Sequence, residues 1–159
     1  MTPAVTAAQK AGVFYKTHAY KHDPKAESYG TEAAEKLNLP EERVFKTLIA
    51  SLQIGGREVL AVAVVPVCAM LDLKKFATTL GGKKAEMADK AAAQRTTGYL
   101  LGGISPLGQK RKLPCVIDAS ATVFETVYVS AGRRGLEIEL APADLLRLTD
   151  ALSKPIAVV

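Results

Sequence analysis

Lys46 is the residue whose surroundings most strongly indicate chemistry. It lies between Phe45 and Thr47 in a stretch that is otherwise strongly apolar, and a charge in such a stretch must face water or be paired. The pattern alone favours a lysine on a sheet edge that points outward. The alternative is an ammonium group at the floor of a cleft. At about 4 Å and an effective dielectric constant near 20, it would there attract a phosphate by about 4 kcal/mol before desolvation.

A glycine-rich loop at residues 100–108 is a second candidate binding element. Three glycines and one proline fall within residues 102–108, so this segment cannot be the interior of a helix or strand. Backbone without Cβ atoms can approach a ligand closely, and the basic run at residues 110–112 could contact a polyanion. A well-packed connection followed by a solvated charged turn explains the same pattern equally well.

A third candidate cluster consists of Ser130, Gly132, Gly135 and Glu137. The local sequence favours a plain hairpin turn at residues 132–135. The two arginines inside this turn could also extend a basic surface formed by residues 110–112 and by the lysine pairs at 74–75 and 83–84. Each such charge that meets a phosphate would make binding more sensitive to salt, whereas solvated surface residues are the default interpretation.

Neither a nucleophile–base pair nor a metal site is indicated. The two histidines, His18 and His22, fall in one expected strand, and no Gly-x-Ser-x-Gly elbow or Walker A motif is present. The His-x-x-x-His spacing lacks the glutamate of the zinc-helix motif, because Ala19 occupies that position. Cys68 and Cys115 form no Cys-x-x-Cys pair and are expected to be small core residues. We therefore expect no cofactor and no metal.

The composition predicts one ordinary globular domain over residues 1–159. Hydrophobic residues make up 48% of the chain, and 21 Lys and Arg against 16 Asp and Glu give a formal charge of +5. This moderate excess favours an acidic partner. No secretory signal pattern and no apolar run of about 18 residues is seen. A reducing cytoplasm is therefore the simplest expected location.

The elements that position these residues are expected to form one α+β domain with a mostly antiparallel, barrel-like mixed sheet flanked by short helices. The expected helices are residues 3–11, 31–38, 73–80, 88–95 and 142–152. The expected strands are residues 13–22, 44–54, 58–65, 114–118, 126–130 and 136–140. Gly55-Gly56 predicts a two-residue hairpin, and residues 59–65, apolar on both faces, predict a central strand. Alternation of apolar and acidic residues in 136–140 predicts a half-exposed strand.

Six segments in chain order closely resemble the YbaK/EbsC family of bacterial Cys-tRNA(Pro) deacylases, which is related to the editing domain of bacterial prolyl-tRNA synthetase. They are residues 44–48, 71–75, 86–89, 94–99, 102–108 and 130–136. The resemblance implies a barrel-like mixed fold and a trans-editing activity that hydrolyses the ester joining cysteine to tRNA(Pro). It further implies that no metal or enzyme nucleophile takes part, because the substrate thiol attacks its own carbonyl. Positioning alone can then lower the barrier substantially.

The resemblance also implies roles for individual residues. Lys46 would hold the phosphate or ribose of the terminal adenosine, Tyr20 and Thr47 would line the aminoacyl pocket, and Ser130 and Glu137 would complete it. Glu137 departs from the aspartate expected in the family. The loop would supply backbone groups near the ester, where an N–H could stabilise an oxyanion. Its residues are Gly102, Gly103, Ile104, Ser105 and Pro106.

Three hypotheses remain open at this level. The first is a deacylase for Cys-tRNA(Pro), which would act on mischarged tRNA(Pro) and form a complex with prolyl-tRNA synthetase. The second is a deacylase of the same fold that acts on Ala-tRNA(Pro). The third is a module that binds tRNA or synthetase through its basic surface without catalysis, which would show salt-dependent binding and no deacylation.

Overall fold

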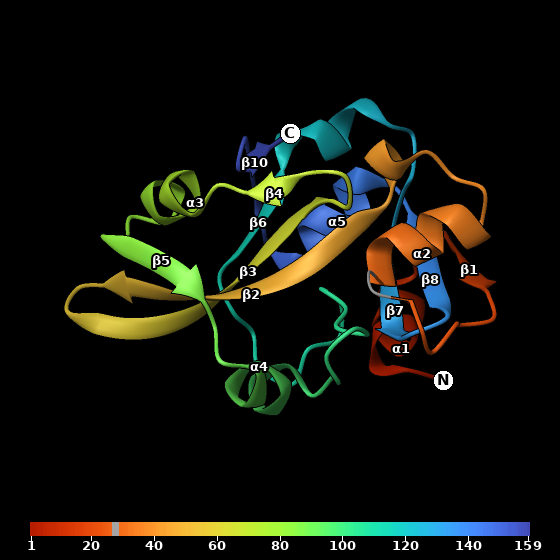
Figure 1. Ribbon diagram of the computed structural model, residues 1–159, viewed down its shortest axis with the longest axis horizontal. Coiled ribbons are helices and arrows are strands. Elements are labelled where there is room, and N and C mark those ends of the chain that lie inside the picture. Colours follow the sequence, from red (N-terminus) through yellow and green to blue (C-terminus); the bar gives the residue numbers. More distant parts are fainter. Residues whose placement is uncertain (27–28) are drawn as a thin grey trace.

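A long antiparallel hairpin runs through the centre of the molecule. The computed structural model describes residues 1–26 and 29–159 (Figure 1). Strands β2 (Phe45–Ile54) and β3 (Arg57–Pro66) pair along their full length. Gly55 and Gly56 join them with φ angles of +58° and +74°, the backbone that a two-residue hairpin turn requires and that glycine adopts at little cost. The predicted hairpin is confirmed.

This hairpin is the middle of a five-stranded sheet with the order β5-β2-β3-β6-β9. Strand β5 (Lys84–Met87) pairs with β2 in antiparallel fashion, whereas β6 (Cys115–Asp118) and β9 (Leu152–Lys154) extend the sheet in parallel. Strand β3 is therefore central, and its residues 61–66 are buried as the sequence predicts.

A second sheet stands beside the first and consists of β1 (Tyr15–Ala19), β8 (Leu136–Leu140) and β7 (Val127–Arg133), in that order. Its pairs are antiparallel, and the register of β7 against β8 shifts between Ser130 and Arg133. Strands β4 (Met70–Leu71) and β10 (Ala157–Val158) form a two-stranded antiparallel sheet. The α+β class is confirmed. The three sheets are open over the described residues, so the barrel-like closure is not confirmed.

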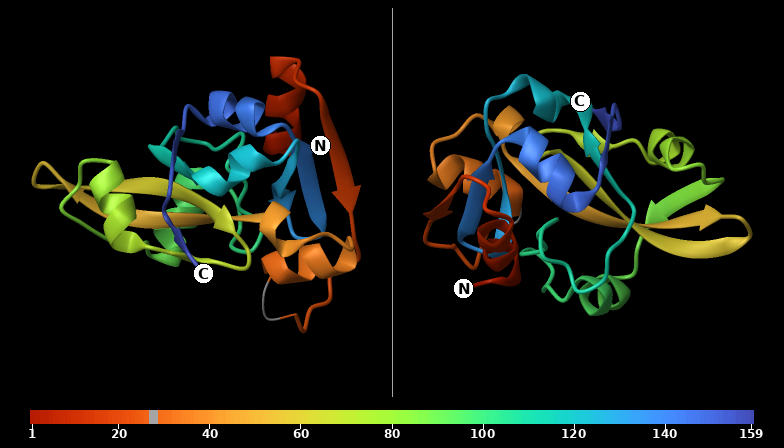
Figure 2. Two further views of the ribbon diagram at one scale, coloured as in Figure 1. Left: turned by 90° about the horizontal axis from the view of Figure 1, so that it is seen from above. Right: turned by 180° about the vertical axis from the view of Figure 1, so that it is seen from behind.

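Short helices cover these sheets. They are α1 (Pro3–Ala11), α2 (Tyr29–Lys36), α3 (Leu73–Thr79), α4 (Lys90–Thr97) and α5 (Pro142–Thr149), with 3-10 turns η1 (Glu41–Arg43) and η2 (Ala119–Val123). Figure 2 shows α1 and α2 on opposite faces of the second sheet. In agreement, Ala4, Val5 and Ala8 of α1 pack in the cluster that contains Val129, whereas Ala33 and Ala34 of α2 pack with Tyr128. Strand β7 is thus covered on both faces.

Several expectations from the sequence are wrong in detail. Strand β1 stops at Ala19 instead of residue 22. Helix α5 stops at Thr149 because Asp150 adopts a left-handed conformation with φ of +53°, so Leu152 lies in β9. Helix α4 begins two residues later than expected, and η2 replaces a simple turn between β6 and β7.

Two burial predictions are also wrong. Cys68 is exposed in the turn after β3, whereas Cys115 is buried as expected. Strand β8 is not half exposed, since Glu137 is only 6% exposed. The face of the second sheet that carries Glu137 is the one beneath α2, which local alternation in the sequence could not reveal. No helix among the described residues is long and apolar enough to cross a membrane.

Candidate active site

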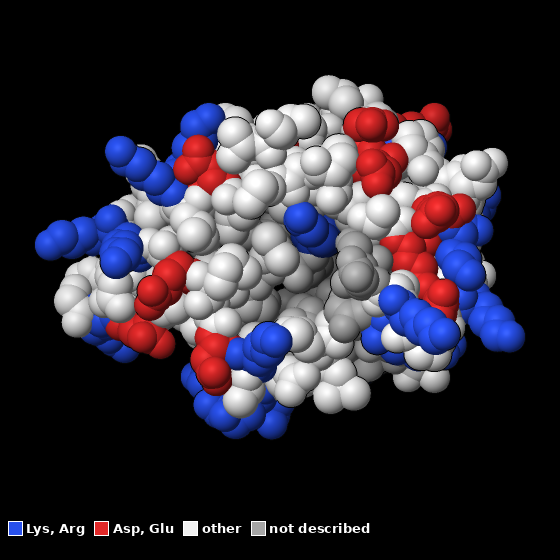
Figure 3. Space-filling model, in the orientation of Figure 1, with Lys and Arg blue, Asp and Glu red and all other residues white. Residues whose placement is uncertain are grey.

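A gap along one edge of β2 contains the cavity in which the candidate residues meet. On that edge β2 pairs with β5 from Ala50 to Gln53 and has a single parallel bridge to β7, between Val44 and Tyr128. Residues 46–49 therefore have no partner strand on that side in the part of the chain that the structure describes. A cavity of about 480 Å³ occupies this gap. The space-filling view is hollowed at this position, between β2 and the loop that follows α4 (Figure 3).

The cavity draws its lining from strands of both larger sheets, from α2 and α4, and from the loop after α4. Its lining residues are Tyr20, Gly30, Phe45, Lys46, Thr47, Leu48, Ile49, Met87, Ala88, Lys90, Ala93, Leu101, Gly102, Ile104, Ser130, Arg133, Arg134 and Glu137. A volume near 500 Å³ is within the range of small-molecule sites. The arrangement therefore has the size and the mixed lining of a ligand pocket.

Strand pairing brings polar residues from three strands to the cavity. Val44 is bridged to Tyr128 in parallel, and Lys46 and Ser130, each two residues further along its strand, both line the cavity. Ser130 is in turn the direct partner of Glu137 on β8. Side chains of paired residues share a face of a sheet. Ser130 and Glu137 thus share one face of the second sheet, and Lys46 of β2 lines the same cavity.

Thr47 contributes polar atoms that nothing in the described structure satisfies. Its hydroxyl oxygen is buried and has no hydrogen-bond partner among the described residues. The carbonyl of Ile49 accepts from the N–H of Ala88 at 3.0 Å, so it points toward the gap side of β2. Along a strand, the N–H and C=O groups of every second residue point to the same side. Thr47 stands two residues before Ile49, so its N–H and C=O also point toward the gap side of β2. A ligand in the cavity can satisfy all of these groups.

Burial shifts the ionisation of the charged groups in the cavity. Desolvation lowers the pKa of Lys46, an effect that nearby Cys68 partly opposes. Burial raises the pKa of Glu137 to about 8. Burial, and then the charge of Glu137, raise the pKa of Tyr20. At neutral pH the carboxyl group of Glu137 is therefore mostly protonated, so it can donate a hydrogen bond.

The glycine-rich loop is only partly a wall of the cavity. Gly102 and Ile104 line it, whereas Gly103, Ser105 and Pro106 do not. Gly103 packs against β7 so closely that a Cβ there would lie 2.8 Å from the Cα of Arg133. Ser105 is fully buried, and its hydroxyl accepts a hydrogen bond from the N–H of Leu107 at 3.2 Å. These residues shape the loop that presents Gly102 and Ile104.

Sequence reasoning missed part of the lining. Lys90, Met87 and Leu101 were not singled out as site residues, and Arg133 and Arg134 were interpreted only as turn or surface charges. The available signal was their position, since Met87 lies within the resembling segment 86–89 and Leu101 directly precedes the segment 102–108. The basic run at residues 110–112 lies outside the cavity, and Lys112 there pairs with Asp150 at 3.3 Å.

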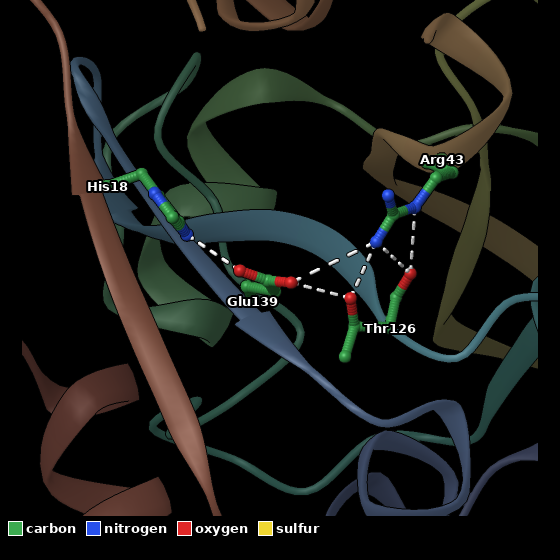
Figure 4. Close-up of polar contacts among 4 residues, drawn as sticks. All are labelled: His18, Arg43, Thr126 and Glu139. Atoms are coloured by element: carbon green, nitrogen blue, oxygen red, sulfur yellow. Dashed lines mark hydrogen bonds and ion pairs between the residues drawn. The ribbon is translucent and has the colours of Figure 1, made fainter. Parts of the chain in front are cut away.

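The histidines serve other parts of the molecule. His18 Nε2 lies 2.8 Å from Glu139 Oε1, and Glu139 Oε2 accepts from the hydroxyl of Thr126 at 2.6 Å (Figure 4). Arg43 donates to the carbonyl of Thr126 at 3.0 Å. This network ties η1 and the start of β7 to strands β8 and β1.

His22 binds Glu32 at 2.7 Å instead, at the entrance to α2. Tyr20 and His22 both lie beyond the end of β1, so the expectation that both histidines fall in one strand is wrong. Neither histidine lines the cavity. No group of three or more His, Cys, Asp or Glu residues suited to a metal ion occurs among the described residues.

Comparison with known proteins identifies relatives of this arrangement. The family model of the aminoacyl-tRNA editing domain matches residues 23–148. A protein of Enterococcus faecalis named as a Cys-tRNA(Pro)/Cys-tRNA(Cys) deacylase, EbsC, is 43% identical over 117 residues, which are 74% of this chain and 70% of that protein. The multifunctional Ser/Thr-tRNA deacylase ProXp-y of Escherichia coli is 28% identical over 104 residues, covering 65% of this chain and 62% of that one.

A solved structure has the same fold. A crystal structure described as a trans-editing enzyme for prolyl-tRNA synthetase superimposes with a TM-score of 0.83 and 22% identity, covering 99% of this chain and 96% of its own. This likeness establishes the fold over nearly the whole length of the chain.

Proposed function

Because this chain belongs to the aminoacyl-tRNA editing domain family, we propose that it is a trans-editing deacylase whose substrate is tRNA(Pro) mischarged with cysteine. The reaction cleaves the ester bond and releases the aminoacyl group from the 3′-terminal ribose. The 43% identity to EbsC favours a cysteinyl ester over other aminoacyl esters. The expected partners are mischarged tRNA(Pro) and prolyl-tRNA synthetase, and the expected location is the cytoplasm, where tRNA is charged and used.

The observation that carries this proposal is a cavity built for positioning. Lys46, Ser130, Glu137 and Thr47 meet at the unpaired edge of β2. The hydroxyl of Ser130 accepts from the N–H of Gly132 at 3.2 Å, and neither histidine reaches it as a base. Its direct partner Glu137 is mostly protonated at neutral pH and is therefore a poor base, and a serine without an effective base is a weak nucleophile. The nucleophile is therefore best supplied by the substrate.

The cysteine thiol of the substrate meets this requirement. Its sulfur attacks the ester carbonyl carbon, a C–S bond forms, and the bond from that carbon to the ribose 3′ oxygen breaks. The thiol proton ends on the departing 3′ oxygen, and the products are a cysteine thiolactone and uncharged tRNA. Holding a tethered nucleophile close to its target can contribute several kcal/mol to catalysis. An alanyl or prolyl ester lacks the thiol and is spared.

Each polar residue then has a defined task. The ammonium of Lys46 holds the phosphate or ribose of the terminal adenosine, and partial burial strengthens this attraction. The N–H of Gly102 stabilises the developing oxyanion, whereas the N–H groups of Leu101 and Gly103 already donate to Gln94 and Leu100. Thr47 and Tyr20 contact the aminoacyl group, and the protonated carboxyl of Glu137 donates a hydrogen bond beside Ser130.

Deacylation of charged tRNA(Pro) tests this function. The wild-type protein should release cysteine from Cys-tRNA(Pro) much faster than alanine or serine from the same tRNA. Lys46→Ala should reduce the rate by about 100-fold or more, whereas Lys84→Ala, at an exposed position on β5 outside the cavity, should leave it unchanged. Equal rates in wild-type and Lys46→Ala proteins would exclude Lys46 from the mechanism.

The same panel separates the competing functions. Preferential release of alanine or serine would reassign the substrate. The assay must include Ser-tRNA(Pro), because the chain is 28% identical to the Ser/Thr-tRNA deacylase ProXp-y. Salt-dependent tRNA binding without any deacylation would identify a binding module. Comparison of tRNA(Pro) and tRNA(Cys) with and without prolyl-tRNA synthetase tests the partner: we expect discrimination between the tRNAs only when the synthetase is present.

A further inference from the structure

The cavity has a polar end and an apolar end along β2. Lys46 and Thr47 stand near the bridge to β7, whereas Leu48 and Ile49 lead to β5. Met87 and Ala88 lie at this end, next to Ala50 and Ile49, and Ala93 and Leu101 line the same cavity. Strand geometry of about 3.3 Å per residue separates Lys46 from Ile49 by about 10 Å. The cavity is therefore longer than the aminoacyl ester that its polar end would hold.

Two side chains at the apolar end are exposed at the cavity mouth. Met87 is 50% exposed and Leu101 is 40% exposed, and both line the cavity. Other large apolar side chains, such as Phe14 and Leu100, are exposed as well, but Met87 and Leu101 are the two of them that line this cavity, where a ligand would cover them.

Both residues are held in place by the fold. Met87 is the last residue of β5 and is paired with Ala50 of β2. The N–H of Leu101 donates to Oε1 of Gln94 on α4 at 2.8 Å, which anchors the loop to that helix. Two fixed apolar side chains on neighbouring elements make a shelf instead of a mobile flap. We call Met87 and Leu101 the apolar shelf.

We propose that the apolar shelf is the subsite for the terminal adenine base of the aminoacyl-tRNA substrate. This rests on the proposed function, which places the ester at the polar end of the cavity. The base is attached to the same ribose as the ester, so it must lie within one sugar of the polar end. Contact with a methionine sulfur and with a leucine side chain stabilises the binding of a flat aromatic base. Lys90, exposed at the start of α4 and lining the same cavity, supplies a cation for the adjoining phosphate.

A binding experiment with two synthetic ligands tests the subsite. The first is 3′-(L-cysteinylamino)-3′-deoxyadenosine, whose amide resists hydrolysis, and the second is the same compound without its base. Their affinities are measured by calorimetry for the wild-type, Met87→Ser, Leu101→Ser and Leu100→Ser proteins. Leu100 is the matched control, because it is exposed and adjoins Leu101 but does not line the cavity.

Removal of the base should weaken binding to the wild-type and Leu100→Ser proteins by about tenfold. In the Met87→Ser and Leu101→Ser proteins, removal of the base should weaken binding by less than about twofold, because the substitution has already removed the contact between the base and the apolar shelf. Equal affinity of the wild-type protein for both ligands would overturn the proposal, as would an undiminished base effect in both shelf variants. Thermal unfolding checks that the variants fold. If only one of the two shelf variants folds, the base effect measured in that variant is enough to test the proposal.

A parallel assay keeps this result separate from the proposed function. If the wild-type protein fails to deacylate Cys-tRNA(Pro) but binds the adenosine compound in a shelf-dependent way, the function is wrong and the subsite holds. If it deacylates Cys-tRNA(Pro) but shows no shelf-dependent base effect, the function holds and the subsite is wrong.

Discussion

Glu137→Gln should make the protein markedly more resistant to alkaline pH. Burial raises the pKa of Glu137 from the ordinary 4.5 to about 8. Between these two pH values the folded protein keeps a proton that the unfolded chain has released. Stability therefore falls as pH rises through this window, and it is independent of Glu137 below and above it. Glutamine has nearly the same shape and cannot ionise, so the variant loses this dependence.

The magnitude follows from the pKa difference. Each unit of pKa corresponds to about 1.36 kcal/mol, so complete ionisation of Glu137 costs the folded state about 5 kcal/mol. About 3 kcal/mol of this falls between about pH 6 and about pH 9. For a chain of 159 residues, that is a difference of roughly 6 to 12 °C in Tm.

Urea and thermal unfolding at the two pH values provide the assay. Wild-type protein should lose about 3 kcal/mol more stability than Glu137→Gln on going from about pH 6 to about pH 9. The control is Glu86→Gln, which replaces a glutamate by glutamine at an exposed position on β5. It should lose as much stability between the two pH values as the wild-type protein. Identical losses in wild-type and Glu137→Gln proteins would refute the reasoning, because Glu137 would then ionise without a cost from burial.

Three further substitutions test the site and the scaffold. Thr47→Val should lower the deacylation rate about tenfold, because it removes a buried hydroxyl from the cavity. The control is Ser51→Ala, which removes a buried hydroxyl without a described partner from the same strand but outside the cavity, and it should leave the rate unchanged. Equal effects of the two substitutions on the rate would argue against a role for Thr47. Asp118→Ala should cost about 3 kcal/mol in urea unfolding, since its carboxylate accepts from two main-chain N–H groups at the start of β10 at 2.9 and 3.0 Å. Gly103→Ala should lower the free energy of unfolding by about 1 to 3 kcal/mol and slow deacylation, because the added Cβ would lie 2.8 Å from the Cα of Arg133. An unchanged Tm and an unchanged deacylation rate would show that the loop can shift to accommodate the methyl group.

Local chemistry explains the elements that could be predicted well. Thr2, Pro3 and Gly12 define both ends of α1, because the threonine hydroxyl accepts from the N–H of Val5 and the glycine takes φ of +70°. Asp72 caps α3 by accepting from the N–H of Lys75. In each case the residues that decide the structure are within a few positions of one another, so their pattern is visible in the sequence.

The errors arose where distant segments decide the outcome. The alternation of apolar and acidic residues in β8 is real, but α2 covers the face that local pattern assigned to water. The residue that packs over a strand can come from any part of the chain, so periodicity predicts which side chains share a face and not whether that face is exposed. Glu137 is buried for this reason.

The candidate site shows the same division. The sequence alone determined that a lysine stands in an apolar strand, that a glycine-rich loop follows α4, and, through family resemblance, which positions to examine. Whether Lys46 faced solvent or a cleft depended on where β5 and β7 stop along the edge of β2. Those strands are encoded about 40 and 80 residues further along the chain. Only the tertiary structure sets where they end in space, and the gap they leave between them is the cavity.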